Sequence, residues 1–311
     1  MRNHSPLNII WHRQTLDHVL EGNFIHNILL SEIKRPLRHL IYDESSNFPY
    51  IDDCLIVSLY DEAHDLLIET AKRGAKNVGL LQMGDEYGQM PQTYLNHVDY
   101  VFRNYFFESY LSPAAENRCF AIEWVPNGNA NGVAGPRIEN SLTFQDRPLT
   151  MFFSGFLGKP DQLIPERDEM VNVIRDSKLP ATLLGTEGFA GGLGPATFSS
   201  YLNNSKFALC PAGNSPETIR FYDAIECGSI PICLKSEYLF HEKALNGAPV
   251  VILDKWNDLP DFINQVTNTS PDLYEQARIE LYNWWREFKL SKAKKIATII
   301  DQSFLKTQKQ E

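Results

Sequence analysis

The chain has 311 residues, of which 43% are hydrophobic and 22% are charged, a composition typical of soluble globular proteins. A formal net charge of −10 argues against nonspecific binding to nucleic acid or to an anionic membrane surface. The length fits one large domain or two domains of ordinary size.

The cysteines and the apolar runs favour a cytoplasmic protein. The five cysteines are an odd number without a C-x-x-C pair, which favours free core thiols over disulfides or a zinc site. No apolar run reaches the length of a membrane span, and the first residues, MRNHSPLNIIWHRQ, lack the apolar core of a signal peptide. We therefore expect a cytoplasmic location and no integral membrane segment.

The first half alternates strand-like and helix-like segments, which predicts an α/β domain with a parallel sheet. The expected strands, of which the second and third look buried, are Leu7–Trp11, His39–Tyr42, Cys54–Leu59, Val78–Met83, Tyr100–Tyr105 and Ala121–Val125. Helices are expected over Phe24–Ile33 and Glu62–Arg73. A loop rich in Asn and Gly follows over residues 127–137, so we place the N-terminal, acceptor-side domain at residues 1–140.

The second half repeats this rhythm. The expected strands are Leu149–Phe153, Ala181–Leu184, Lys206–Cys210, Ile230–Leu234 and Val250–Leu253. The expected helices are Glu166–Arg175, Phe198–Asn203, Leu273–Leu290 and Lys292–Leu305. We place a nucleotide-sugar-binding domain at residues 141–285 and a C-terminal helix at 286–311, with packing back on the N-terminal domain as one arrangement. Two Rossmann-like domains would bind a ligand at the carboxyl ends of both sheets.

Residues 205–234, SKFALCPAGNSPETIRFYDAIECGSIPICL, carry the most informative pattern. They predict a strand, a loop, a helix and a second strand. Ser215 suits the N-cap, Pro216 the first helical position, and Gly228 the end of the helix.

Three polar residues of this helix, Glu217, Arg220 and Asp223, are spaced to lie close to one face. A glycine loop that leads into a helix N-terminus can bind an anion such as a diphosphate. An arginine one turn into the helix and a carboxylate one turn further suit the phosphates and ribose of a nucleotide sugar.

This segment resembles the donor-binding segment of the exostosin family of glycosyltransferases through SKFALCPAGN, PETIRFYDAI and GSIPICL. LTMFFSGFLGKPDQLIPERDEM, at residues 149–170, is similar to that family's phenylalanine-rich strand, small-residue turn and later arginine. The resemblance implies a GT-B architecture, with two Rossmann-like domains whose parallel sheets face each other across a cleft. It also implies transfer of a sugar from a nucleotide diphosphate sugar to a glycan or other hydroxyl acceptor.

The resemblance further implies an inverting reaction that uses no metal ion and no cofactor. The sequence contains no D-x-D triplet. Glu217 and Glu226 are separated by eight residues, whereas retaining GT-B enzymes often have glutamates separated by seven. These features favour an inverting, metal-independent glycosyltransferase.

The resemblance assigns roles to Glu217, Arg220 and Asp223. Arg220 grips the diphosphate and stabilises the leaving group, the alternative being a surface ion pair with Glu217 or Asp223. Asp223 occupies the place of a glutamate that would bind the ribose, although a solvated carboxylate is the alternative. Glu217 either touches the sugar or favours the helix N-terminus through its charge.

The other expected donor-binding residues are small or basic. Gly213 and Asn214 allow the backbone to approach a phosphate, as they also would in a plain turn. Further candidates near the end of the first strand of the second domain are Ser154, Gly155, Lys159 and Arg167. The loop after residue 184 could hold the base of the nucleotide, with Phe189 stacking on it, or be an ordinary surface loop.

An inverting transfer also needs a general base. Asp85 and Glu86, in the sequence GDEY, follow a strand where α/β active sites form, although a strand-end turn is the alternative. His12 is a second candidate, and the segment Arg103–Tyr105 could contact the acceptor.

Two other function classes stay open. A nucleotide-sugar epimerase of GT-B fold would use the same donor site without an acceptor. A non-catalytic module would bind a nucleotide sugar or glycan without turnover. A dinucleotide oxidoreductase is disfavoured because G-x-G-x-x-G is missing after the first strand. The leading hypothesis is a glycosyltransferase in polysaccharide biosynthesis.

Overall fold

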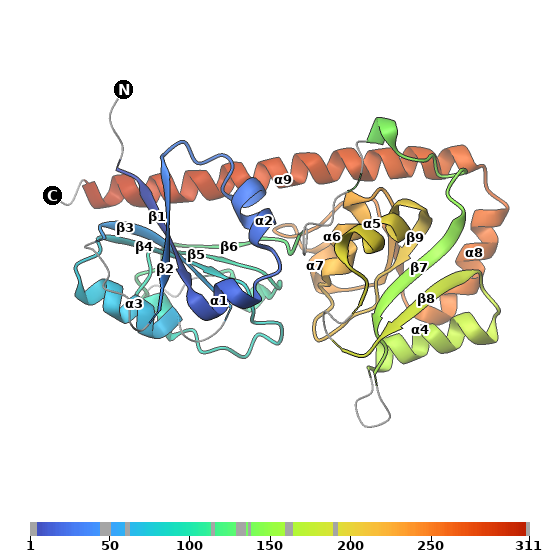
Figure 1. Ribbon diagram of the computed structural model, residues 1–311, viewed down its shortest axis with the longest axis horizontal. Helices are drawn as coiled ribbons and strands as arrows, with labels where there is room; N and C mark the ends of the chain where they lie inside the picture. Colours follow the sequence, from blue (N-terminus) through green and yellow to red (C-terminus); the bar gives the residue numbers. More distant parts are fainter. Residues whose placement is uncertain are drawn as a thin grey trace. The chain divides into compact units, whose positions relative to one another are not determined.

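The computed structural model describes residues 5–43, 51–59, 63–112, 116–128, 135, 138–158, 164–188 and 192–308. The chain divides into two compact units. The first consists of residues up to 126 together with those from 289 onward, and the second of residues 127–288 (Figure 1).

The first unit contains a six-stranded parallel sheet of order β2-β1-β3-β4-β5-β6. Its strands are β1 (Leu7–His12), β2 (Leu37–Tyr42), β3 (Asp53–Ser58), β4 (Asn77–Gln82), β5 (Tyr100–Arg103) and β6 (Ala121–Trp124). Its short helical segments are α1 (Arg13–His18), α2 (Gly22–Phe24), a π-helix (Ile25–Leu29) and α3 (Ala63–Lys72). Leu66 and Leu67 of α3 share one buried apolar cluster with Ile56 and Leu80 of β3 and β4. Both central strands are buried along their length, which is typical of parallel sheets.

Two expectations for this unit were wrong. The segment His39–Tyr42 is not buried, because β2 is the edge strand and pairs on one side with β1; Ile41 is 43% exposed. Phe24–Ile33 is not one α-helix. The backbone N–H of Leu30 donates to the carbonyl of Ile25, five residues earlier, and this wider π-turn keeps Ile25, Leu29 and Leu30 buried.

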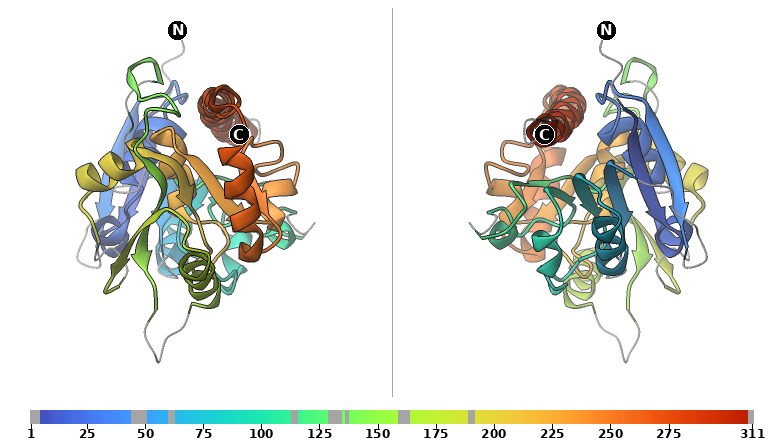
Figure 2. Two further views of the ribbon diagram at one scale, coloured as in Figure 1. Left: turned by 90° about the vertical axis from the view of Figure 1, so that its right-hand side faces the viewer. Right: turned by 90° about the vertical axis from the view of Figure 1, so that its left-hand side faces the viewer.

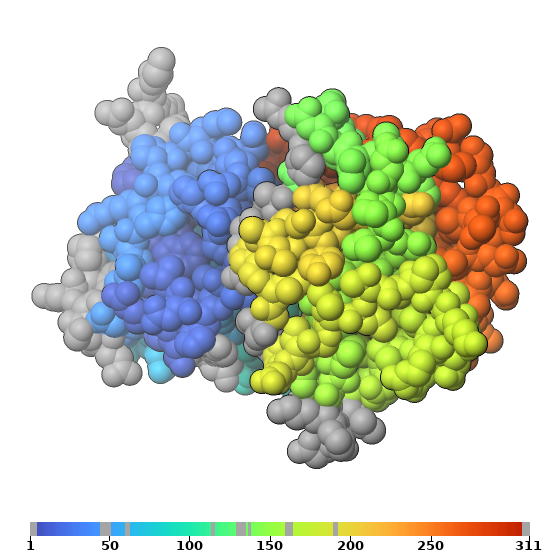
Figure 3. Space-filling model, turned by 45° about the vertical axis from the view of Figure 1, so that its right-hand side comes forward, coloured from blue at the N-terminus to red at the C-terminus, as the bar shows by residue number. Residues whose placement is uncertain are grey.

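The second unit contains a five-stranded parallel sheet of order β11-β10-β9-β7-β8. Its strands are β7 (Leu149–Phe156), β8 (Ala181–Thr186), β9 (Ser205–Leu209), β10 (Ile230–Leu234) and β11 (Val251–Leu253). Its helices are α4 (Pro165–Asp176), α5 (Pro195–Asn203), α6 (Ile219–Glu226), α7 (Glu237–Phe240) and α8 (Leu259–Thr267). Helices α5 and α6 pack together on one face of the sheet and α4 and α8 on the other (Figure 1). Four residues of α5, Pro195, Ala196, Thr197 and Ser200, are exposed, and the helix forms part of the yellow surface in Figure 3.

Two boundaries in this unit also differ from the expected ones. Strand β7 does not stop before Ser154 but continues to Phe156, because Ser154, Gly155 and Phe156 still pair with β8. Helix α6 begins at Ile219 rather than Pro216, and Thr218 is its N-cap in extended backbone. The helix ends before Gly228, as expected.

The C-terminal segment is one helix, α9 (Pro271–Gln308), and not the two expected helices. Figure 2 shows this helix viewed along its axis. Its part from residue 289 belongs to the first unit, where Lys292 Nζ lies 2.6 Å from Glu123 Oε1 and 2.9 Å from the carbonyl oxygen of Trp124. In the described part of the chain, no helix combines the length and the apolarity that a membrane crossing requires.

The cysteines are all free and buried, as the spacing predicted. Burial raises their pKa, to about 11 for Cys119 and to about 12 for Cys233. These thiols are therefore neutral core side chains rather than nucleophiles.

Both sheets place their first strand between the second and the third, as β2-β1-β3 and as β8-β7-β9. The direction of winding thus reverses between β1 and β3 in one unit and between β7 and β9 in the other. In open α/β sheets, ligands bind outside the carboxyl ends of the strands at such a reversal. The topology therefore points to a ligand site at the carboxyl ends of β1 and β3 in the first sheet and of β7 and β9 in the second.

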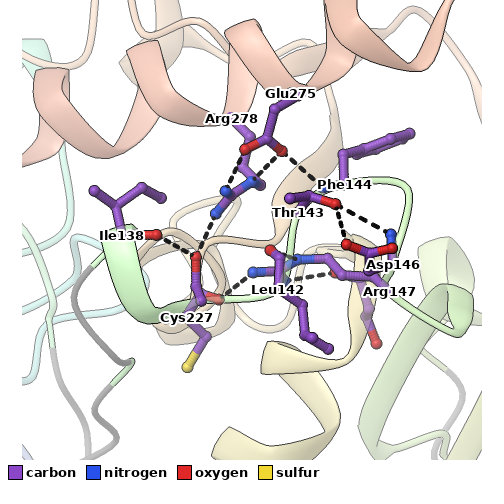
Figure 4. Close-up of polar contacts among 11 residues, drawn as sticks. Ile138, Leu142, Thr143, Phe144, Asp146, Arg147, Cys227, Glu275 and Arg278 are labelled. Atoms are coloured by element: carbon purple, nitrogen blue, oxygen red, sulfur yellow. Dashed lines mark hydrogen bonds and ion pairs between the residues drawn. The ribbon is translucent and has the colours of Figure 1, made fainter.

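A buried arginine holds the opposite end of the second unit together. Arg147 is 1% exposed and donates to the carbonyl oxygens of Leu142, Leu202, Ser205 and Cys227 at 2.9–3.4 Å. The pair Arg278–Glu275, with Nη2 2.6 Å from Oε1, lies beside it (Figure 4). Burial, with the nearby charge of Arg278, lowers the pKa of Arg147 to about 10.

Replacement of Arg147 by Met should lower the free energy of unfolding by about 3 kcal/mol or more, because buried carbonyl groups lose their donors. Urea denaturation measures this change. Arg175, exposed in the last turn of α4, is the matched control, and Arg175→Met should stay within about 0.5 kcal/mol of the parent protein. Equal free energies of unfolding for the two variants would show that the hydrogen bonds of Arg147 do not stabilise the fold.

Candidate functional site

Two arginines converge on the carboxyl ends of β7 and β9, where the winding of the second sheet reverses. Arg220, the second residue of α6, donates from Nε to the carbonyl oxygen of Ser154 at 2.6 Å. Its Nη1 lies 3.3 Å from Thr218 Oγ1, and its guanidinium carbon lies 5.1 Å from the centre of the Phe153 ring.

Arg167, in the first turn of α4, lies beside the same ring, at 5.9 Å from its centre. Its Nη1 donates to the carbonyl oxygen of Phe156 at 2.5 Å, and its Nε donates to that of Ala212 at 3.1 Å. Arg167 therefore links the end of β7 to the loop that follows β9.

Glu166 also holds this loop, a role that the sequence did not reveal. Its Oε1 accepts hydrogen bonds from the backbone N–H of Ala212 at 2.9 Å and from Trp256 Nε1 at 3.3 Å. Consecutive residues of α4 thus bind the N–H and the C=O of Ala212. The loop Pro211–Asn214 is consequently fixed before any ligand arrives.

Two glycines of the sequence motifs make room for the arginines. A Cβ at position 155 would clash with the guanidinium of Arg220. A Cβ at position 213 would lie 2.9 Å from Nη2 of Arg167. The small residues in FFSGF and PAGN are therefore explained by close approach of the guanidinium groups.

The arrangement concentrates positive charge. Burial, with the like charge of Arg167 as the next cause, lowers the pKa of Arg220 to about 10. Arg220 is held by a carbonyl and a hydroxyl oxygen, and not by the carboxylates of Glu217 or Asp223 that the surface-pair alternative required. An anion bound here would form charge-assisted hydrogen bonds and reduce the repulsion between the two arginines.

The two carboxylates of the motif lie inside the protein. Glu217 and Asp223 are each 3% exposed. The expected single helix face was wrong for Glu217, which precedes α6; its Oε1 accepts from Tyr222 Oη at 2.9 Å and from the N–H of Asn127 at 3.2 Å. The charge of Asp223 acts on Arg220 and raises its pKa, so Asp223 is a near neighbour of the cationic pair and not a solvated carboxylate.

The remaining donor candidates differ in exposure. Ser154 is 6% exposed, Gly213 is half-buried, and Asn214 is exposed. Lys159 and Phe189 lie outside the described residues.

The expected general-base residues follow β4 in the first unit. Asp85 is buried and accepts from the N–H groups of Gln89 and Met90 at 2.8 and 3.1 Å, and its Oδ2 lies 3.2 Å from Arg103 Nη2. These contacts use both carboxylate oxygens. Glu86 is half-buried and accepts from Tyr105 Oη at 3.2 Å.

The sequence did not reveal a third carboxyl group in the first unit, that of Glu21. Glu21, between β1 and β2, is 5% exposed. Burial raises its pKa to about 7, and the charge of Glu86 adds to this rise. A lone glutamate within the apolar stretch HVLEGNFI was the available signal, but no motif surrounds it. His12, the other candidate, ends β1, and its Nδ1 is buried without a hydrogen-bond partner in the described part of the chain.

Comparisons with known proteins find relatives of the second unit and of the whole fold. The family model described as RXYLT1 C-terminal domain matches residues 194–305, which include α5, β9, α6 and β10. The chain is 23% identical to ribitol-5-phosphate xylosyltransferase 1 of Danio rerio over 186 residues, 54% of this chain and 42% of that protein. It is 28% identical to a probable glycosyltransferase of Arabidopsis thaliana over 152 residues, 47% of this chain and 26% of that protein. The matched parts make up less than half of the length of these relatives.

Solved structures extend the likeness to nearly the whole chain. An α1,3-fucosyltransferase with GDP has a TM-score of 0.56 at 16% identity, covering 97% of this chain and 92% of that one. A DNA-modifying β-glucosyltransferase has a TM-score of 0.53 at 12% identity, covering 95% and 99%. The chain has the α/β GT-B fold of glycosyltransferases, as predicted, and its relatives in sequence are also glycosyltransferases. The resemblance to exostosins in particular stays a prediction.

The close approach of Gly155 to Arg220 can be tested by a double-mutant cycle. Gly155→Ala should lower the free energy of unfolding by about 1–3 kcal/mol, because the added Cβ displaces the guanidinium. In an Arg220→Ala background the same change should cost at least about 1 kcal/mol less, since the clash is gone. Urea denaturation of the four proteins gives the coupling energy, and additive effects would contradict the observed packing.

Proposed function

We propose that this chain is a glycosyltransferase that moves a sugar from a nucleotide diphosphate sugar to a hydroxyl group of a glycan or related acceptor. The observation that carries the proposal is the convergence of Arg167 and Arg220 at the reversal point between β7 and β9. The names of the sequence relatives support the same class of reaction.

In this proposal the second unit binds the donor. The guanidinium groups of Arg220 and Arg167 bind the diphosphate, and the backbone at Gly213 and Asn214 approaches it closely. As the bond between sugar and phosphate breaks, charge grows on the leaving diphosphate, and Arg220 stabilises it most in the transition state. Asp223, beside Arg220, is the proposed partner of the ribose.

The other donor contacts are assigned more simply. Ser154 and Gly155 shape the end of β7, Lys159 adds positive charge, and Glu217 supports the start of α6 from within. We propose an inverting reaction without a metal ion. In the described residues there is no group of three or more His, Cys, Asp or Glu side chains that could hold a metal ion. A cytoplasmic location and a role in polysaccharide biosynthesis stay predictions.

The relatives suggest which substrates to try first. Three of the sequence relatives, in Danio rerio, Mus musculus and Homo sapiens, are named ribitol-5-phosphate xylosyltransferase 1. Nucleotide-linked xylose is therefore the first donor to test, and a ribitol-5-phosphate group is the first acceptor.

A thermal-shift screen with UDP-, GDP- and CDP-sugars tests the donor site. One donor should raise the melting temperature of the parent protein, because a ligand that binds the folded state stabilises it by mass action. Arg220→Ala should weaken that binding at least about tenfold, the loss expected for charge-assisted hydrogen bonds of 1.5–3 kcal/mol. Calorimetric titration gives the two dissociation constants, and Arg175→Ala is the matched control that should bind like the parent.

The product decides between the function classes. Transfer of the sugar to an acceptor, detected by mass spectrometry, supports the proposal. An isomerised donor formed without an acceptor would indicate an epimerase, and binding without turnover would indicate a non-catalytic module. No thermal shift with any donor would contradict both the transferase and the epimerase, and would leave only a glycan-binding module of the three.

A further inference from the structure

We infer that Glu21 is the general base that takes the proton from the acceptor hydroxyl, an inference that rests on the proposed transfer reaction. Glu21 lies in the first unit, in the connection that follows the carboxyl end of β1.

The first observation is position. Glu21 lies in the connection that leaves the carboxyl end of β1, and the winding of this sheet reverses between β1 and β3. Thr15, earlier in the same connection, accepts through Oγ1 a hydrogen bond from the N–H of Leu59, which follows β3. The segment that carries Glu21 is thereby tied to the end of β3, at the edge where α/β sheets bind ligands.

The second observation is the environment of the carboxyl group. Glu21 is buried, and the charged side chain whose field acts on it, among the described residues, is Glu86 from the turn after β4. Burial and this like charge raise its pKa, whereas the backbone N–H groups of Leu20 and Glu21 lower it, and the result is about 7. A general base whose pKa is near the working pH is ionised in a large fraction of the molecules and is still basic enough to take the proton.

The third and fourth observations concern the backbone. The π-helix Ile25–Leu29 begins four residues after Glu21, and π-turns occur frequently at functional sites. Tyr105, after β5, is buried with a φ of +55°, a conformation that costs energy for a residue with a side chain. Its hydroxyl donates to Glu86, so the strained residue fixes the carboxylate that acts on Glu21. Tyr105 and Glu86 are therefore positioning residues.

Asp85 suits the role less well. Its Oδ1 already accepts from two backbone N–H groups and its Oδ2 from Arg103, so both carboxylate oxygens are engaged within the protein. Glu21 has no such arginine partner among the hydrogen bonds and ion pairs of the described residues, and its raised pKa follows from burial.

The Glu21 carboxylate takes the proton of the acceptor O–H while the acceptor oxygen forms a bond to the anomeric carbon of the sugar. The bond from that carbon to the diphosphate oxygen breaks, and its electron pair leaves with the nucleoside diphosphate. Glu21 then returns the proton to solvent.

The isosteric variant Glu21→Gln tests this role with three readouts. Transfer should fall about 10²- to 10⁴-fold, the usual contribution of a general base, while the dissociation constant of the donor changes less than twofold. The melting temperature at pH 8 should rise, because a folded pKa above the ordinary value means that ionisation of Glu21 destabilises the fold as pH rises through 7. The control Glu69→Gln, on α3, should match the parent protein in all three.

The pH profile supplies a readout that a structural role would not move. The acid limb of kcat/KM should lie near pH 7 in the parent and move to lower pH in Glu86→Gln, because loss of the neighbouring charge lowers the pKa of Glu21. This measurement uses only the parent protein and Glu86→Gln, so it still tests the role of Glu21 if Glu21→Gln does not fold.

The outcomes separate the two proposals. Transfer within threefold of the parent by Glu21→Gln, or an acid limb that does not move in Glu86→Gln, would overturn the assignment of Glu21 and leave the transfer reaction standing. A parent protein that binds no nucleotide sugar and transfers none would overturn the proposed function itself, before either variant is made.

Discussion

The placement of Arg220 against the end of β7 is the interaction on which the second unit is organised. A guanidinium group taken partly out of water needs hydrogen-bond acceptors, and here it finds the backbone carbonyl of Ser154. That bond requires a glycine at 155, a helix that starts at Ile219, and a strand that continues to Phe156. A second arginine, Arg167, lies at the same ring of Phe153, and its positive charge repels that of Arg220. Two cations held by neutral acceptors form a site that favours an anion.

The parts of this site support one another through the backbone. Arg147 fixes the far end of α6 through the carbonyl of Cys227, while Arg220 fixes its beginning. Glu166 and Arg167 hold both polar groups of Ala212, so the loop before α6 is set as well. Such preorganisation lowers the cost of binding a flexible diphosphate and of stabilising its charge in the transition state.

The sequence predicted the fold and most strands because apolar runs and glycine breaks are local signals. It misplaced the start of α6, since Ser215 and Pro216 resemble a helix start although residues 215–218 form an irregular turn stabilised by the Ser215 hydroxyl. It placed Glu217 on one helix face with Arg220 and Asp223, because periodicity does not report that Glu217 precedes the helix and is bound inside the protein by Tyr222 and Asn127. It missed Glu21, whose altered pKa arises from burial and from Glu86, sixty-five positions away along the chain. A local sequence pattern does not report which side chains are buried by residues distant along the chain.

The charge and position of Arg167 and Arg220 predict that the second unit binds a nucleotide sugar at the reversal point between β7 and β9. Hydrogen–deuterium exchange with and without the donor that most raises the melting temperature tests this claim most directly. A donor bound at this point should slow exchange in two segments, residues 153–158 and 210–223, with little change at the opposite end of the sheet around Ser177 and Lys178. Protection confined to other segments, with these two unchanged, would contradict it.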